Sequence, residues 1–193
     1  GACILTDHGL RTAMPVCLGE QRVLGIVKRR FLVTEGIPDA LEIEKYIKKH
    51  FHGSDVPEKV FKKREFISLF GKTIGRMHRC GIFQGDLRER NVLVQEGDPP
   101  EIYLIDNERT RKYPRLPERK RLKNLVQANM TRIEEITRTD RLRFFLAYLE
   151  ENPGLKDMRR TWMKRILSKT QARLMLKGRK VRSHKKQIRE IFL

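Results

Sequence analysis

Three polar residues stand at spacings that suit phosphoryl transfer: Asp86, Asn91 five positions later, and Asp106 fifteen beyond that. In such a reaction one carboxylate orients the substrate hydroxyl, while an amide and a second carboxylate hold magnesium ions that bridge nucleotide phosphates. Magnesium binds a few carboxylate or amide oxygens together with phosphates and water. We therefore predict that Asp86 and Arg88 are catalytic, that Asn91 and Asp106 bind metal, and that ATP and Mg²⁺ are the cofactors. The alternative is that they are ordinary turn residues, since Asp and Asn are favoured in turns.

The local sequence predicts a short hairpin that would bring the three side chains to one rim. Residues 92–94 and 102–105 are apolar, β-prone runs, and a segment rich in Gly and Pro separates them. Asp86 and Asn91 would lie in the loop that enters the first strand, and Asp106 at the exit of the second. This combination of Gly-Asp-Leu-x-x-x-Asn, strand, turn and strand ending in Asp is far more restrictive than one aspartate near a turn.

Four segments carry a resemblance to a known family. Residues 77–86 look like a helix end followed by a catalytic loop, residues 104–109 like a metal motif of the form Ile-Asp-x-Asp/Glu-Arg, and residues 123–127 and 139–149 like two following helices. In these features the chain resembles the lipopolysaccharide kinases that phosphorylate Kdo or heptose in the inner core, a branch of the protein-kinase-like superfamily. The resemblance spans most of residues 9–149. It implies an ATP-dependent phosphotransferase whose acceptor is a lipopolysaccharide precursor or another glycolipid.

Two departures separate the chain from protein kinases proper. Gln84 stands where those enzymes carry the His of His-Arg-Asp, and Asn107 and Glu108 stand where they carry Phe-Gly. Glu108 either adds a second carboxylate near the metal or pairs with Arg109. No Ala-Pro-Glu follows before the next helical pattern near Pro117, which favours a small or glycan hydroxyl over a peptide as the acceptor.

The segment ahead of these motifs resembles the last strand and the hinge of a kinase small lobe. Residues 30–38 form an apolar run that ends in a Gly/Pro break, which predicts a buried strand. An extended hinge exposes backbone donors and acceptors that can pair with an adenine edge, so Glu35, Gly36 and Ile37 are candidates for binding the nucleotide base. A plain edge strand followed by a turn is the alternative.

A complete kinase would carry a Gly-rich phosphate loop and a strand lysine upstream of this point. About thirty residues precede Phe31, and they contain neither pattern. They predict instead the end of a helix that closes at Gly9 and a strand around residues 13–18. We therefore expect an N-terminally incomplete chain, which would bind nucleotide poorly and transfer phosphate slowly.

Helical patterns dominate after the hinge. Apolar residues recur at three- and four-residue spacing over residues 66–77, 122–133 and 142–149, which predicts three amphipathic helices. We expect the first helix to end at Gly81 and the last to begin with Thr139 as its cap. The apolar stripes are interpreted as core.

Length and composition fit one compact α+β, protein-kinase-like fold, because 193 residues with 39% hydrophobic content can bury a sizeable core. We predict a partial small lobe and hinge over residues 1–37, a catalytic helical lobe over 38–152, and a basic helical segment over 153–193. No run approaches eighteen apolar residues, so no membrane span is predicted. Three widely spaced cysteines favour reduced thiols in the cytoplasm over a disulfide framework.

The formal charge of +19 is concentrated near the C-terminus, where residues 156–193 hold fourteen Lys or Arg against two acidic residues. Apolar residues recur through this segment at near-helical spacing up to an expected stop at Gly178. One face could therefore dock on the body while a cationic face meets something acidic. We expect this segment, with its basic residues from 179 to 186, to target an anionic inner-membrane surface or a phosphorylated glycolipid and to take no part in phosphoryl transfer.

Three function classes stay open. A sugar or glycolipid kinase, peripheral at the cytoplasmic face of the inner membrane, accounts for both the motifs and the charge. An atypical protein kinase or pseudokinase on the same scaffold would bind nucleotide without phosphorylating a sugar. A nucleic-acid-binding module fits the charge equally well, but the sequence offers no zinc-finger or RNP-like motif to accompany it.

Overall fold

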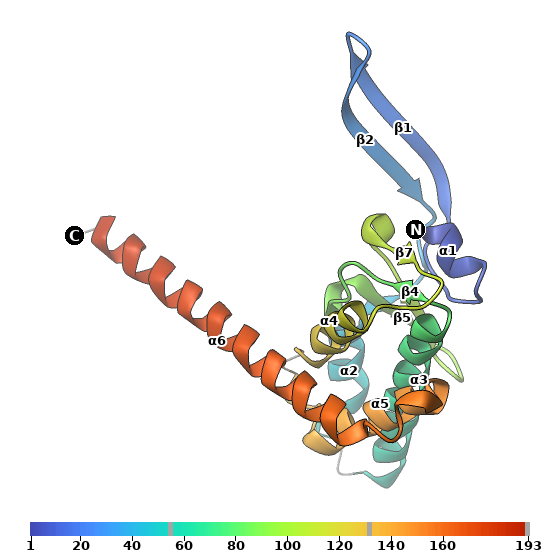
Figure 1. The fold of residues 1–193 in the computed structure, drawn as a ribbon, viewed down its shortest axis with the longest axis vertical. Helices are drawn as coiled ribbons and strands as arrows, with labels where there is room; N and C mark the ends of the chain where they lie inside the picture. The colour runs from blue at the N-terminus through green and yellow to red at the C-terminus, as the bar shows by residue number, and fades with distance from the viewer. Residues whose placement is uncertain (54–55, 131–132, 192–193) are drawn as a thin grey trace.

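The computed structural model describes residues 1–53, 56–130 and 133–191, with side chains described as far as Leu176. A helical body carries small antiparallel sheets on one side, and two elements project from it, a hairpin and a long C-terminal helix (Figure 1). The predicted α+β class is confirmed. The division at residues 37/38 and 152/153 stays a prediction.

The predicted helices are confirmed, although their ends differ. The segment around 122–133 is helical only to Asn129, and Ile133 is buried outside the helix. The helices of the described chain are α1 (Ala2–Thr6), α2 (Ile43–Phe51), α3 (Pro57–Arg79), α4 (Glu118–Asn129), α5 (Arg138–Glu151) and α6 (Arg159–Ile191).

The hairpin predicted at the motif is also confirmed. Strands β5 (Val92–Gln95) and β6 (Glu101–Leu104) pair antiparallel, and the short β3 (Leu41–Glu42) lies along the other edge of β5. A second pair, β4 (Ile82–Phe83) and β7 (Arg111–Lys112), flanks the loops before and after this hairpin. The chain therefore enters and leaves the hairpin beside the same small ladder.

The strand predicted over residues 30–38 exists, but the prediction that it is buried is wrong. Strand β2 (Ile26–Thr34) pairs with β1 (Pro15–Val23), and together they form the hairpin that projects from the body (Figure 1). Phe31 is 56% exposed, because no further strand or helix of the described residues covers either face of this two-stranded hairpin.

Two helix boundaries also differ from those predicted. Thr137, not Thr139, caps α5, because a capping box requires a polar partner at the third helical position and Asp140 stands three residues after Thr137. Helix α6 continues through Gly178, since one glycine costs a helix interior only about 1 kcal/mol.

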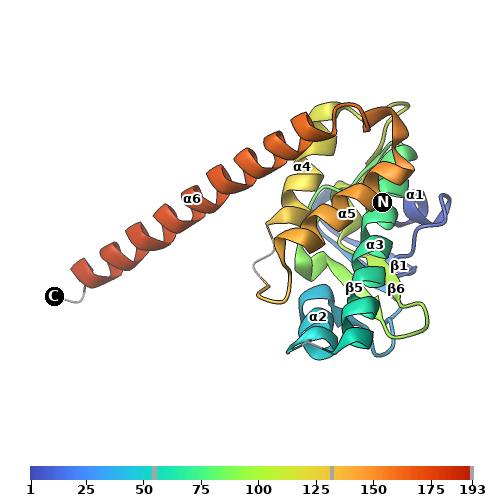
Figure 2. The ribbon, with the colours of Figure 1, turned by 90° about the horizontal axis from the view of Figure 1, so that it is seen from below.

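Helix α6 docks on the body through its first turns. Trp162, Ile166 and Thr170 are buried, and the helix packs against α4. The rest of α6 extends away from the body (Figure 2). The basic residues from 179 to 186, predicted to target an anionic surface, lie outside the described side chains. Among the described residues, no helix is both long and apolar enough to cross a bilayer.

Close contact between α3 and α5 forms the centre of the body. Gly71 and Gly75 lie one turn apart on α3, and their lack of side chains lets the two backbones approach. A Cβ at Gly71 would overlap the Phe144 carbonyl oxygen, and one at Gly75 would stand 2.7 Å from Glu151 Cβ.

A chain of buried polar groups crosses this centre from α5 to α4. His78 of α3 is fully enclosed, with Nδ1 3.0 Å from the Tyr148 hydroxyl and Nε2 3.2 Å from Asn124 Oδ1. Because Asn124 Oδ1 accepts only, Nε2 carries the proton and Nδ1 accepts from Tyr148, which in turn accepts from Arg121. The ring is thus neutral: burial, reinforced by the nearby Arg121 charge, lowers the pKa of His78 to about 3.

We expect Gly71→Ala to lower the free energy of unfolding by about 1–3 kcal/mol, as overpacking of a core does. Helix propensity alone would favour alanine by about 1 kcal/mol, so a loss identifies the contact with α5 as the cause. Urea unfolding of the wild type and the variant measures this change in the free energy of unfolding. Gly154→Ala is the matched control, because a Cβ there meets open space, and it should change stability by less than about 0.5 kcal/mol.

The depressed pKa of His78 predicts acid-sensitive stability. Below the ordinary value of 6.5 the unfolded chain takes up a proton that the folded state refuses down to about pH 3. Stability contributed by neutral His78 is therefore complete above pH 6.5 and falls by about 1.4 kcal/mol per unit as the pH drops through this window. Unfolding curves between pH 6.5 and 5 should show a shallower slope for His78→Gln. An NMR titration with His78 protonating near pH 6.5 would contradict the assignment.

Candidate active site

The three residues singled out for phosphoryl transfer lie together at the mouth of the β5–β6 hairpin. Asn91 ends a short 3₁₀ turn (Glu89–Asn91) that leads into β5. Its side-chain nitrogen Nδ2 donates to the backbone carbonyl oxygen of Asp86 at 2.8 Å. The same nitrogen is 3.4 Å from Asp106 Oδ2, just after β6. Buried Asn91 thus links the two aspartates, and the three side chains lie close together.

Asp86 is held from two directions. Its Oδ1 forms an ion pair with Arg88 Nε at 2.6 Å and accepts a hydrogen bond from Gln127 Nε2 of α4 at 3.3 Å. Its side chain is 19% exposed, which leaves room for a substrate hydroxyl while the partners restrict its orientation. A fixed carboxylate with one accessible side can act as a general base or an orienting group.

Asp106 has an unusual backbone conformation. Its φ of +57° lies in the left-handed region, which is uncommon for residues other than glycine and more accessible to Asp than to most others. This conformation turns the chain out of β6 into a 3₁₀ turn (Asn107–Arg109) and leaves the Asp106 side chain exposed beside Asn91.

The pair Asn91–Asp106 fits magnesium in its donor chemistry. The side-chain nitrogen of Asn91 is already hydrogen-bonded. Among the described residues no donor bonds the side-chain oxygen of Asn91, and Oδ1 of Asp106 is also without a donor. Among the same residues no cluster of three His, Cys, Asp or Glu could hold a metal. Magnesium does not need one, because it binds through one or two protein oxygens plus phosphates and water.

Asn124 of α4 fixes the loop that carries Asp86. Its amide nitrogen donates to the Gln84 carbonyl at 2.6 Å and to Gln127 Oε1 at 3.0 Å, while its oxygen accepts from the Gln84 backbone N–H at 3.3 Å. Gln84 in turn donates to the Ile105 carbonyl at 2.9 Å, immediately before Asp106. The loop of Asp86 and the turn of Asp106 are therefore tied to one buried network.

The predicted base-binding residues and Asp106 line one cavity of about 480 Å³. Glu35, Gly36 and Ile37 form one wall, and Leu93 and Ile105 form an apolar floor. The Glu35 N–H already donates to Met14 O at 2.9 Å, and Ile37 O accepts from Ala40 N. Among the described residues, the Glu35 carbonyl and the Ile37 N–H have no such partner and can face an adenine edge.

Glu108 lines this cavity as well, and no ion pair joins it to Arg109 among the described side chains. Asp86 lines a different cavity of about 370 Å³, together with Lys123, Gln127 and Arg173. The two aspartates therefore open to different cavities, with Asn91 between them.

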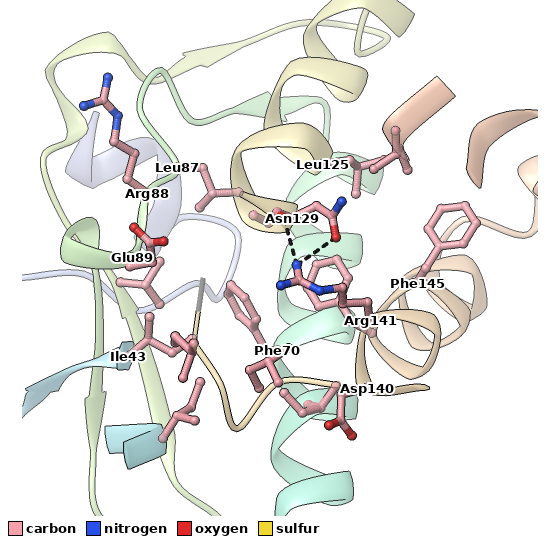
Figure 3. Close-up of a pocket in the computed structure, with 18 residues that line it drawn as sticks. Ile43, Phe70, Leu87, Arg88, Glu89, Leu125, Asn129, Asp140, Arg141 and Phe145 are labelled. Atoms are coloured by element: carbon pink, nitrogen blue, oxygen red, sulfur yellow. Dashed lines mark hydrogen bonds between the residues drawn. The ribbon is translucent and has the colours of Figure 1, made fainter. Parts of the chain in front are cut away.

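A third cavity, of about 90 Å³, lies behind the loop (Figure 3). Leu87, Phe70, Leu125 and Phe145 supply much of its apolar wall, and Arg141 donates to both the backbone and side-chain oxygens of Asn129 at its edge. Its lining supports the loop from below, because Leu87 is buried against it.

Sequence analysis assigned no role to Asn124, Gln127, Lys123 or Arg173. A signal existed for the first two, since polar residues interrupt the apolar stripe of α4 on its buried side, next to Leu125 and Val126. No sequence signal pointed to Arg173, because its position near Asp86 depends on how α6 docks on the body.

Comparison with known proteins gives two findings, and no curated protein sequence matches. A solved structure described as "WaaP in complex with acyl carrier protein" is similar, with a TM-score of 0.68 and 22% sequence identity over 88% of this chain and 72% of that one. This likeness confirms the kinase-like fold predicted from the sequence. The sequence profile of the Lipopolysaccharide kinase (Kdo/WaaP) family matches residues 4–148, about three quarters of the chain. This chain therefore belongs to the Lipopolysaccharide kinase (Kdo/WaaP) family.

Proposed function

We propose that this protein is an ATP- and Mg²⁺-dependent phosphotransferase acting on a sugar hydroxyl, Kdo or heptose, of the lipopolysaccharide inner core. The observation that carries the proposal is the cluster of Asp86, Asn91 and Asp106 beside a cavity walled by the hinge residues. Membership of the lipopolysaccharide kinase family supports the class of acceptor.

Each residue has a role that follows from its position. When bound, Mg²⁺-ATP supplies the phosphoryl group and a cation that offsets its negative charge. Asn91 and Asp106 would hold the metal through their oxygens, and the Glu35 carbonyl and Ile37 N–H would orient the base. Asp86 would accept a hydrogen bond from the acceptor hydroxyl and receive its proton.

Arg88 has two possible partners in this scheme. It pairs with Asp86 in the structure, and its side chain is 53% exposed, so it can rotate toward a phosphate. A guanidinium binds phosphate bidentately, which suits the negative oxygens in transfer. We further propose that the reaction takes place on the cytoplasmic face of the inner membrane, where the net charge of +19 favours an anionic surface.

Asp86→Asn should lower turnover by about 10²–10⁴, the usual contribution of a general base, and leave nucleotide affinity and the unfolding midpoint largely unchanged. The amide preserves size and the contact with Gln127 but cannot take a proton. Phosphate transfer from radiolabelled ATP to a lipopolysaccharide core acceptor measures it. Asp157→Asn, at an exposed carboxylate outside the site, is the control. Near-normal turnover of Asp86→Asn would remove the catalytic assignment.

Asp106→Asn should weaken magnesium-dependent ATP binding by roughly tenfold or more, because it removes the negative charge of a metal ligand, and Asn91→Ala, which removes a neutral oxygen ligand, should weaken it somewhat less. Asparagine is chosen at position 106 because it tolerates the left-handed backbone. Calorimetry in Mg²⁺ and in EDTA separates the metal contribution from base binding. Affinities that are equal to wild type in Mg²⁺ would mean that Asp106 only makes the turn. Glu108→Gln in the same titration tests whether that carboxylate also faces the metal.

A further inference from the structure

The cavity that contains Asp86 continues into a groove between α4 and α6. One end, about 370 Å³, is lined by Asp86, Lys123 and Arg173, and the other, about 570 Å³, also has Lys123 and Arg173 in its wall. Leu176 is shared by both ends as well. The docking of α6 therefore creates a continuous surface that leads to the candidate catalytic carboxylate.

Basic residues outnumber acidic ones in this groove, seven against Asp86 and Glu89. Lys123 and Arg173 are only partly exposed, and further cations surround them. Arg88 pairs with Asp86, and none of the other six basic residues pairs with a carboxylate among the described side chains. They are Arg109, Arg119, Lys120, Lys123, Lys169 and Arg173.

Lys123 shows how the neighbouring cations of the groove affect a single side chain. Its Nζ donates to the Gly85 carbonyl at 3.2 Å and lies 5.2 Å from the centre of the Phe83 ring, so the ammonium is fixed beside the loop of Asp86. Burial, followed by the nearby charges of Lys120 and Arg173, lowers the pKa of Lys123, although the charge of Asp86 acts in the opposite direction. A bound anion would offset this repulsion and satisfy the donors that remain.

We propose that Lys123 and Arg173, with Arg109 at the rim, form a subsite for a phosphate or carboxylate group on the acceptor saccharide, and thereby position its hydroxyl at Asp86. The inference rests on the proposed phosphotransferase function and adds to it the residues that recognise the acceptor. It also gives α6 a part in the active site, whereas the sequence analysis separated the basic segment from phosphoryl transfer.

The arrangement of the two cavities assigns the subsite to the acceptor and not to the nucleotide. The hinge and Asp106 line one cavity, while Asp86, Lys123 and Arg173 line the other. A nucleotide bound at the hinge reaches the site from the Asp106 side. An acceptor whose anionic group binds Arg173 approaches from the Asp86 side, where its hydroxyl must be deprotonated.

The first test is a titration of the 193-residue chain with inorganic phosphate, followed by the ¹H–¹⁵N signals of its arginine Nε–H groups. We expect the Arg173 signal to shift, and Arg173→Gln and Lys123→Gln each to weaken phosphate binding about tenfold, the loss typical for a hydrogen bond to a charged group. Arg173→Lys should keep part of the affinity. Lys164→Gln, at an exposed position on α6 outside the groove, is the matched control and should bind phosphate like wild type.

The second test uses a lipopolysaccharide core fragment as the acceptor. Arg173→Gln should raise its KM about tenfold with kcat within twofold of wild type, because the subsite binds a group remote from the reacting hydroxyl. Treating the fragment with phosphatase, or esterifying its carboxylates, identifies the source of the anion: the treatment that removes it raises the wild-type KM and abolishes the difference from Arg173→Gln.

Several results would overturn the proposal. Phosphate affinities of Arg173→Gln and Lys123→Gln within twofold of wild type would do so, as would an equal loss in Lys164→Gln, which would indicate unspecific charge. Loss of binding to phosphatidylglycerol vesicles in Arg173→Gln, with phosphate affinity unchanged, would assign the groove to a membrane surface instead. Failure of ATP to bind would overturn the proposed function alone, because the phosphate titration requires no nucleotide.

Discussion

The side-chain amide of Asn124 holds together the parts on which the candidate site depends. It is fully buried and satisfies both backbone groups of Gln84, so a helix and the start of the loop that carries Asp86 behave as one unit. An unpaired polar group at this depth would cost about 1–3 kcal/mol. Breaking one hydrogen bond of this network is therefore unfavourable unless its partners rearrange as well. Through Gln127 the same amide reaches Asp86, and through His78 and Tyr148 it reaches α5.

The rest of the site follows from this fixed point. Gln84 links the loop of Asp86 to the segment before Asp106, and Asn91 closes the gap between the two aspartates. The two carboxylates nevertheless open to separate cavities, one walled by the hinge and one by α4 and α6. This separation is what a transfer between a donor and an acceptor requires, because each substrate needs its own approach to a shared centre.

Helix α6 has two structural features that composition alone could not separate. Its first turns are held by buried Trp162 and Ile166, which fix its position on α4. That position brings the charge of Arg173 to the cavity of Asp86, where it joins Lys123, and the charge of Asp86 offsets only part of the repulsion that lowers the pKa of Lys123. The helix contacts the body with apolar side chains, and Lys169 and Arg173 follow on the same helix to line the groove beside α4.

The sequence by itself determined the local parts: the strand–turn–strand motif that presents Asp86, Asn91 and Asp106, and the helices that follow, because turn residues and apolar periodicity act over a few neighbouring positions. It could not determine what depends on residues distant in the chain. Burial of β2 was predicted from its apolar run, yet burial requires a covering element, and the β1–β2 hairpin projects from the body. Only the tertiary structure decided that Asn124 and Gln127 support the loop of Asp86 and that Arg173 lines the same cavity as Asp86, since side chains on different elements meet only when packing has set their relative positions.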